Sequence, residues 1–216
     1  MKQLRQTIRR LILESQACEN LNGVLQGAIN QMVERDLEIV YYITESRMQI
    51  VFKEVGTGDK FGILKATTDP FTLEGECWGG YMVSWAKVNN DLKGTGLGAL
   101  MYDVALELVA DAGLMADRNS VSTDALRNWK YFKKSTDYIK KPLDNKDGEY
   151  TSGMPEDDCA SGSYFEHGGS LFANSRVVPA KYFRKHPLNQ VVVKKDQTQP
   201  TFKCLQGLGR IRVKGE

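Results

Sequence analysis

Polar and apolar residues alternate with a period of two over much of the segment between residues 37 and 88. This alternation, rich in Ile, Val, Tyr and Phe, predicts β-strands, and the short polar or glycine-containing breaks between them predict turns. The strands expected from this pattern are Leu37–Thr44, Met48–Val55, Phe61–Thr67 and Trp78–Val88. Because the breaks are short, we expect an antiparallel meander.

Apolar residues recur at helical spacing before and after this segment. Residues 16–35 carry one apolar stripe, and residues 99–112 carry a second, Leu100, Met101, Val104, Ala105, Leu108 and Val109. A third helix is expected to start at a Ser122 or Thr123 cap, with Ala125, Leu126, Trp129 and Phe132 on its inner side. Short strands are expected at Leu114–Ala116, Gln190–Lys194 and Arg210–Val213.

The sequence predicts one domain over residues 16–216, with a loop-rich insertion near residues 135–176. Residues 1–15 are expected to be an amphipathic N-terminal leader or helix with a basic face. The sequence Ile12-x-Glu14 within it resembles the leaders that prohead proteases remove from internal proteins of tailed phages. This resemblance implies a phage origin and packaging in the virion.

The chain has 216 residues, 41% hydrophobic and 26% charged, with a net charge of +2. These values are typical of a water-soluble globular protein, and no apolar run has the length of a membrane span. Cys18, Cys77, Cys159 and Cys204 are scattered, so we expect free thiols, no zinc site and a cytoplasmic location. The acidic residues of the insertion are expected to be solvated rather than to bind calcium.

Basic residues dominate the chain from Arg176 onward. A basic surface is one feature of nucleic-acid binding. Few aromatic residues lie among these cations, however, so we favour a solvated basic face over a nucleic-acid partner. The oligomeric state is not determined by the sequence.

Three glycines, Gly94, Gly96 and Gly98, alternate with other residues between the last strand of the meander and the helix over 99–112. Glycine lets a backbone turn sharply and approach a ligand closely. The first N–H groups of the helix that follows lack intrahelical partners, and phosphate groups bind at such helix starts. The loop therefore predicts a phosphate or pyrophosphate site; a glycine-rich turn without a ligand is the alternative.

The sequence Val88-x-x-Asp91-x-Lys93-Gly94-x-Gly96-Leu97-Gly98 resembles the acyl-CoA loop of the GNAT superfamily of N-acetyltransferases. The chain departs from that pattern at Asn90, where Pro is usual, and at Lys93, which replaces Arg or Gln. The resemblance covers residues 78–132. It implies a GNAT-like α/β fold and the transfer of an acetyl group from acetyl-CoA to an amine of a small molecule or protein, without a metal.

The same resemblance implies which residues form the site. Those expected to bind the cofactor are Val88, Lys93, Gly94, Thr95, Gly96, Leu97, Gly98 and Ala99. The family places a catalytic Tyr where this chain has Trp129, so Tyr131 is the substitute candidate, and Ser122 lies at the family's Asn. For the general base we favour Asp117 over Glu76 and His167.

Two other functions stay open. The chain can be a GNAT-like acyl-CoA-binding or phage structural protein without catalysis, because the family's Tyr is missing. It can also be a Rossmann-type dinucleotide enzyme, since Gly94-x-Gly96-x-x-Ala99 fits that fingerprint and Asp117 lies where a ribose-binding acid is expected. Two features argue against the Rossmann alternative: the turn before the glycines is long, and the sequence lacks an alternating βα pattern.

Overall fold

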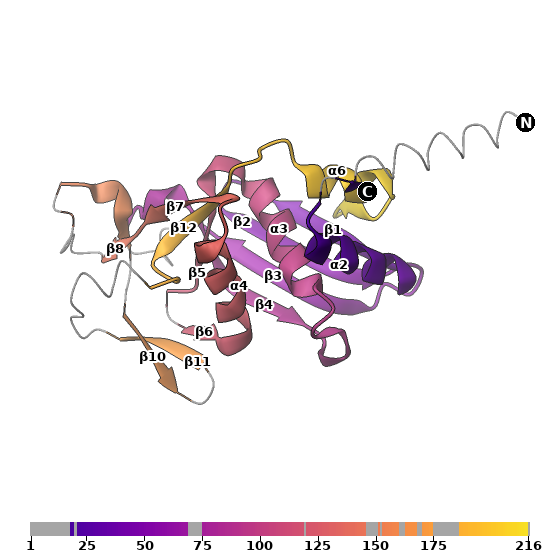
Figure 1. Cartoon of the computed structure of the whole chain (residues 1–216), viewed down its shortest axis with the longest axis horizontal. Coiled ribbons are helices and arrows are strands. Elements are labelled where there is room, and N and C mark those ends of the chain that lie inside the picture. The colour runs from indigo at the N-terminus through magenta and orange to yellow at the C-terminus, as the bar shows by residue number, and fades with distance from the viewer. Residues whose placement is uncertain are drawn as a thin grey trace, which may run out of the picture.

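The computed structural model has an α/β fold with an eight-stranded mixed sheet at its centre (Figure 1). The structure describes residues 18–19, 21–68, 75–118, 120–145, 151, 153–159, 163–167, 170–174 and 186–215. The expected leader over residues 1–15 and its Ile12-x-Glu14 motif lie outside these described residues.

The strand order in the sheet is β13-β1-β2-β3-β4-β5-β12-β7. The strands are β1 (Leu37–Ile43), β2 (Arg47–Glu54), β3 (Lys60–Thr67), β4 (Tyr81–Val88), β5 (Leu114–Ala116), β7 (Tyr138–Pro142), β12 (Gln190–Lys194) and β13 (Ile211–Val213). Strands β1 to β4 pair antiparallel in sequence order, which confirms the predicted meander. The expected strands at 114–116, 190–194 and 210–213 are confirmed as well.

Two neighbouring pairs in this sheet are parallel, β4 with β5 and β1 with β13, and the other pairs are antiparallel. A Rossmann domain requires a mostly parallel sheet with helices on both faces. The fold therefore lacks the framework that the dinucleotide alternative needs.

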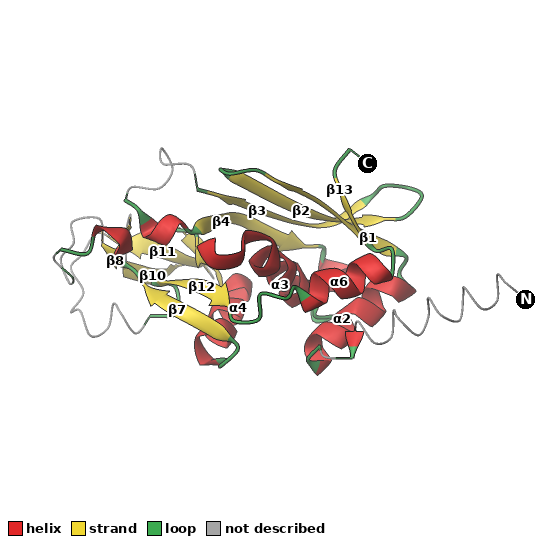
Figure 2. Ribbon diagram, turned by 90° about the horizontal axis from the view of Figure 1, so that it is seen from above, coloured by secondary structure: helices red, strands yellow, loops and turns green. Residues whose placement is uncertain are grey.

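Helices cover one face of the meander, as Figure 2 shows for α2, α3 and α6. The helices are α2 (Gly23–Glu34), α3 (Leu97–Val109), α4 (Thr123–Lys134) and α6 (Pro200–Gly207). Side chains cap two of them, because Asn22 accepts from Leu25 N and Ser122 accepts from Ala125 N. The predicted Ser122 cap is confirmed. Helix α6 was not predicted from the sequence.

Helix α3 lies at the centre of the main core. Ten of its thirteen residues are buried, including Leu100, Val104 and Leu106, so it is enclosed on more sides than its single apolar stripe suggested.

None of the helices of the described part is long and apolar enough to cross a membrane.

Residues 135–176 contain more regular structure than predicted. Strand β7 lies at the edge of the main sheet, and β10 (Ser163–His167), β11 (Ser170–Asn174) and β6 (Ser120–Ser122) form a second sheet. A third sheet pairs β8 (Asp144–Asn145) with β9 (Asp158–Cys159). Strands this short leave little periodicity in a sequence, so the pattern of hydrophobic residues did not predict them.

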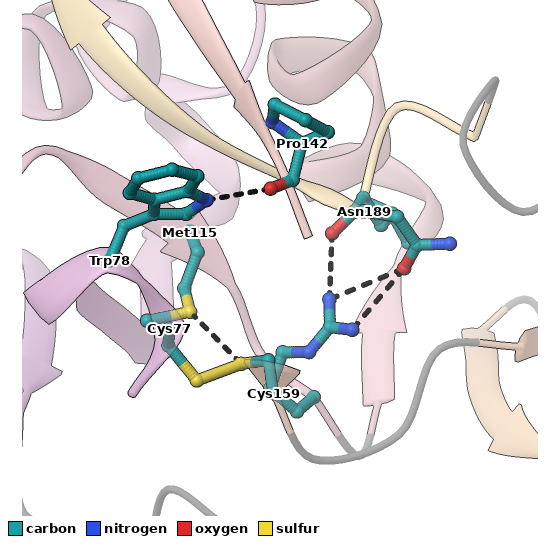
Figure 3. Close-up of a disulfide and its surroundings, with 8 residues drawn as sticks. Cys77, Trp78, Met115, Pro142, Cys159 and Asn189 are labelled. Atoms are coloured by element: carbon teal, nitrogen blue, oxygen red, sulfur yellow. Dashed lines mark hydrogen bonds between the residues drawn. A yellow bond between two sulfur atoms is a disulfide. The ribbon is translucent and has the colours of Figure 1, made fainter. Parts of the chain in front are cut away.

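Two disulfides join the four cysteines, Cys18 with Cys204 and Cys77 with Cys159. The expectation of free thiols was therefore wrong. The partners are far apart in sequence, so spacing gives no indication of the pairing. Figure 3 shows Cys77–Cys159 beside Trp78, whose Nε1 donates to Pro142 O at 2.7 Å. The disulfide attaches β9, and the hydrogen bond attaches the end of β7, to the short 3-10 turn that precedes β4.

A buried ionic network attaches α3 to the C-terminal part of the chain. The ammonium of Lys194 contacts Asp103 Oδ2 at 2.7 Å and Glu107 Oε1 at 2.5 Å. Thr201 Oγ1 and Tyr138 Oη also donate to Asp103, at 2.6 and 3.3 Å. Burial raises the pKa of Glu107 although Lys194 opposes the shift, whereas the two carboxylates raise the pKa of Lys194 against the effect of its own burial.

Three of the C-terminal cations that the structure describes are buried or paired with carboxylates. Lys194 is buried in the network, Arg210 pairs with Asp36 at 2.5 Å, and Arg212 pairs with Glu38 at 2.7 Å. These three cations do not belong to a free basic surface.

We expect Lys194→Met to reduce the free energy of unfolding by about 3–5 kcal/mol, because it leaves two buried carboxylates without their counter-ion. Lys195→Met, at the exposed neighbouring position, serves as the control and should change stability by less than about 0.5 kcal/mol. Urea denaturation measures both. Equal stabilities of the two variants would show that the network does not hold α3.

His186 should make stability depend on pH. Burial, and then the charges of Lys133, Lys130 and Arg118, lower the pKa of His186 to about 4 from its ordinary 6.5. The unfolded chain therefore binds this proton more tightly, and stability falls as the pH decreases from about 6.5 to 4. Urea denaturation across this range should give a shallower pH dependence for His186→Gln than for the wild type; parallel curves would contradict the prediction.

Candidate functional site

The glycine loop makes the sharp turn that its sequence predicts. Gly94 and Gly96 have φ values of 81° and 84°, which L-residues rarely adopt. A Cβ atom on Gly96 would lie 3.2 Å from Ala28 Cβ and 3.3 Å from Val24 O of helix α2. Gly96 therefore allows both the turn and the close packing of α2 against the start of α3.

The start of α3 is open. Gly96 occupies the N-cap position and has no side chain to cap the helix. The N–H groups of Leu97, Gly98 and Ala99 lie in the first turn, where the helix offers no acceptor, and none of them donates to another described residue. These donors and the positive end of the helix dipole favour an anion at this place.

Strand β4 leaves one edge unpaired next to this helix start. It pairs with β5 only over Tyr81–Val83. On the other edge, Lys65 pairs with Trp85 and Ala66 with Val83, so Ser84 is the extra residue of a β-bulge. No described strand pairs with the β5-facing edge of β4 beyond Val83, and its backbone groups are free to bind an extended ligand.

A cavity of about 750 Å³ extends along this free edge. Its wall comes from β4, the glycine loop, α3, the residue that follows β5, strand β6 and α4. The lining residues are 83–88, 90, 92–94, 96, 98, 99, 101, 102, 117, 120–122, 124, 125 and 127–129. The cavity therefore joins the open helix start, the free strand edge and the end of β5 in one site.

Charged side chains surround the entrance of the cavity near the glycine loop. Asp124 contacts Lys93 Nζ at 3.2 Å and the guanidinium of Arg127 at 3.4 Å, and all three side chains are more than half exposed. Because these pairs are exposed, each contributes at most about 1 kcal/mol. A phosphate group can therefore replace Asp124 as the partner of both cations at little cost.

Six of the eight predicted cofactor-binding residues line the cavity: Val88, Lys93, Gly94, Gly96, Gly98 and Ala99. Thr95 and Leu97 do not. The Thr95 hydroxyl donates to Leu92 O at 2.7 Å, and the Leu97 side chain is fully buried in the core.

Two of the three candidate catalytic residues line the cavity, and the third does not. Asp117 and Ser122 line the cavity, with Asp117 Oδ1 accepting from Ser120 N at 3.2 Å and Ser122 capping α4. Tyr131 does not line the cavity; its side chain is 45% exposed and its ring contacts Phe132 and Tyr138. It lies away from the site because it is two residues beyond Trp129, about 200° around the helix.

The structure describes the side chain of only one of the two alternative bases, Glu76. Glu76 is exposed and does not line the cavity, and His167 lies in β10, where its side chain is outside the described part of the structure. Sequence patterns missed Tyr102, which lines the cavity from α3 and packs on Trp129. Its one detectable signal is a phenolic hydroxyl in a mostly apolar helix.

Three carboxylates away from this cavity are close enough together to hold a metal ion. One oxygen each from Asp144, Asp157 and Asp158 lies within 4.8 Å of the others. Asp144 and Asp157 are buried, so the expectation of a fully solvated acidic loop was wrong for them. Thr151 Oγ1 contacts both, at 2.7 Å from Asp144 Oδ2 and 2.8 Å from Asp157 Oδ2, so a threonine hydroxyl bridges these two carboxylates.

Compared with known proteins, the chain matches no family model and no curated protein. A function for this site is therefore argued from its residues and their geometry.

Two alanine substitutions in the loop should have opposite effects on stability. Gly96→Ala places a side chain in a left-handed conformation and against α2, and should destabilise the protein by at least about 1–2 kcal/mol. Gly98→Ala adds a Cβ whose nearest neighbour is 4.0 Å away, and should stabilise α3 by up to about 1 kcal/mol. Thermal unfolding distinguishes them, and similar melting temperatures would contradict the described loop.

Proposed function

We propose that this chain is an N-acetyltransferase of the GNAT type, which transfers an acetyl group from acetyl-CoA to an amine. One observation carries the proposal: the open start of α3 and the unpaired edge of β4 border the same cavity. The helix start suits the pyrophosphate of CoA. The strand edge suits the extended, amide-containing pantetheine arm. The order of meander, glycine loop and helix agrees with the family resemblance.

In the proposed reaction the amine nitrogen attacks the thioester carbonyl carbon while both substrates are bound. The C–S bond then breaks, and the products are an amide and the thiol of CoA. The amine must lose a proton, and Asp117 is the carboxylate that lines the cavity at the end of β5. Ser122 is committed to the cap of α4, so we assign it a structural role beside the cofactor.

An acyl-CoA-binding protein without catalysis is the second candidate. The position of Tyr131 supports it, because the phenol expected to replace the family's Tyr does not reach the cavity. Both candidates bind the same cofactor. They differ in the release of free CoA thiol when acetyl-CoA and a panel of amines are supplied together.

Calorimetric titration with acetyl-CoA tests the proposal, with NAD titrated in parallel. Wild type should bind acetyl-CoA with micromolar affinity, and Gly98→Glu should weaken binding by about tenfold or more. A Cβ atom at position 98 has room, and a carboxylate there is favourable for the helix start, but it would compete with the pyrophosphate for that place.

Gly98→Gln is the matched control, because it has nearly the same size without the charge, and it should bind more tightly than Gly98→Glu. If wild type does not bind acetyl-CoA, the proposal is wrong. Binding of NAD alone would favour a dinucleotide ligand instead.

A further inference from the structure

Helices α3 and α4 meet at two aromatic side chains that line the cavity, Tyr102 and Trp129. Their ring centroids are 5.6 Å apart at an interplanar angle of 80°, and Phe132 packs against both at 6.0 and 5.7 Å. Only 2% of Tyr102 and 1% of Trp129 is exposed. Both rings are therefore fixed in the core.

The polar atom of each ring has no hydrogen-bond partner among the residues that the structure describes. Neither Tyr102 Oη nor Trp129 Nε1 makes a hydrogen bond to a described residue. In the described part, the fully enclosed side-chain nitrogen and oxygen atoms without a hydrogen-bond partner are Asp158 Oδ1 and Gln190 Nε2. The donors of Tyr102 and Trp129 are not among these fully enclosed atoms. The small exposed area of each side chain therefore includes its donor atom. Because both residues line the cavity, we infer that their donor atoms face the cavity.

We propose that Tyr102 Oη and Trp129 Nε1 form a binding site for a carbonyl oxygen in the acyl-pantetheine arm of the cofactor. This inference rests on the function proposed above. The indole N–H can only donate, so the site requires an acceptor. The adjacent wall is apolar, formed by Val83, Met101 and Val121, which disfavours a charged phosphate and suits a neutral carbonyl.

The position along α3 agrees with this assignment. Tyr102 is five residues after Leu97, the first residue of the helix, which corresponds to about 7.5 Å along its axis. If the pyrophosphate binds at the helix start, the part of the cofactor that lies beside Tyr102 is therefore the pantetheine arm. Burial raises the pKa of the Tyr102 hydroxyl, so near neutral pH the phenol stays protonated and acts as a hydrogen-bond donor.

Tyr102→Phe tests the site, because it removes the donor and keeps the ring contacts. Calorimetric titrations with acetyl-CoA and with CoA are compared for wild type, this variant and Tyr42→Phe, an exposed tyrosine of β1 away from the cavity. We expect Tyr102→Phe to weaken acetyl-CoA binding about fivefold, with an unchanged melting temperature. Tyr42→Phe should bind as wild type does.

The two ligands identify the carbonyl. A loss for acetyl-CoA alone assigns the thioester oxygen, and an equal loss for CoA assigns an amide oxygen of pantetheine. Unchanged affinities for both ligands would overturn the inference and leave the proposed function intact. A wild type that binds neither ligand would refute the proposed function and the inference with it.

The indole N–H of Trp129 gives an independent readout. Its ¹⁵N-labelled resonance, assigned by its loss in Trp129→Phe, should shift downfield when acetyl-CoA binds. The indole of Trp78, already bonded to Pro142 O, is the internal reference and should not shift. An unshifted Trp129 resonance at saturating acetyl-CoA would overturn the role of Trp129.

Discussion

Two carboxylates on a buried helix constrain the whole molecule. Asp103 and Glu107 lie on α3, which is enclosed by the core, and a charge in such surroundings needs a counter-ion and hydrogen bonds. Lys194 and Thr201 provide them from a distant part of the chain. The meander half and the C-terminal half are therefore joined by charge as well as by apolar packing. Helix α3, which this network holds in place, also carries the two features of the candidate site: its open N-terminus and Tyr102, which directly precedes Asp103.

Local patterns predicted the elements well and their partners poorly. The meander, the strand over 190–194 and the Ser122 cap follow from alternation and from the hydrogen-bonding chemistry of serine. The sequence does not show that the charges on α3 meet Lys194, because that contact depends on the fold. The disulfide pairs were hidden for the same reason, since partners 82 and 186 residues apart are brought together only by the fold.

The candidate site shows the same division between local and distant information. The glycine loop could be located from the sequence because its φ values demand glycine at Gly94 and Gly96. The lining from α4 could not, because the facing side depends on how that helix rotates against α3. Tyr131 was chosen for its chemistry and nearness in sequence, whereas Tyr102, on another helix, is the phenol that reaches the cavity.

The two disulfides give the folded chain the covalent topology of nested rings. Cys18–Cys204 closes a ring over most of the chain, and Cys77–Cys159 closes a smaller ring inside it. A single peptide-bond cleavage between residues 18 and 204 therefore cannot separate the fragments while the outer bond is intact, and a cleavage between residues 77 and 159 is bridged twice. The fragments of a nicked molecule would stay covalently joined under non-reducing conditions. Its strands would stay at high effective concentration, because the fragments remain tethered to each other.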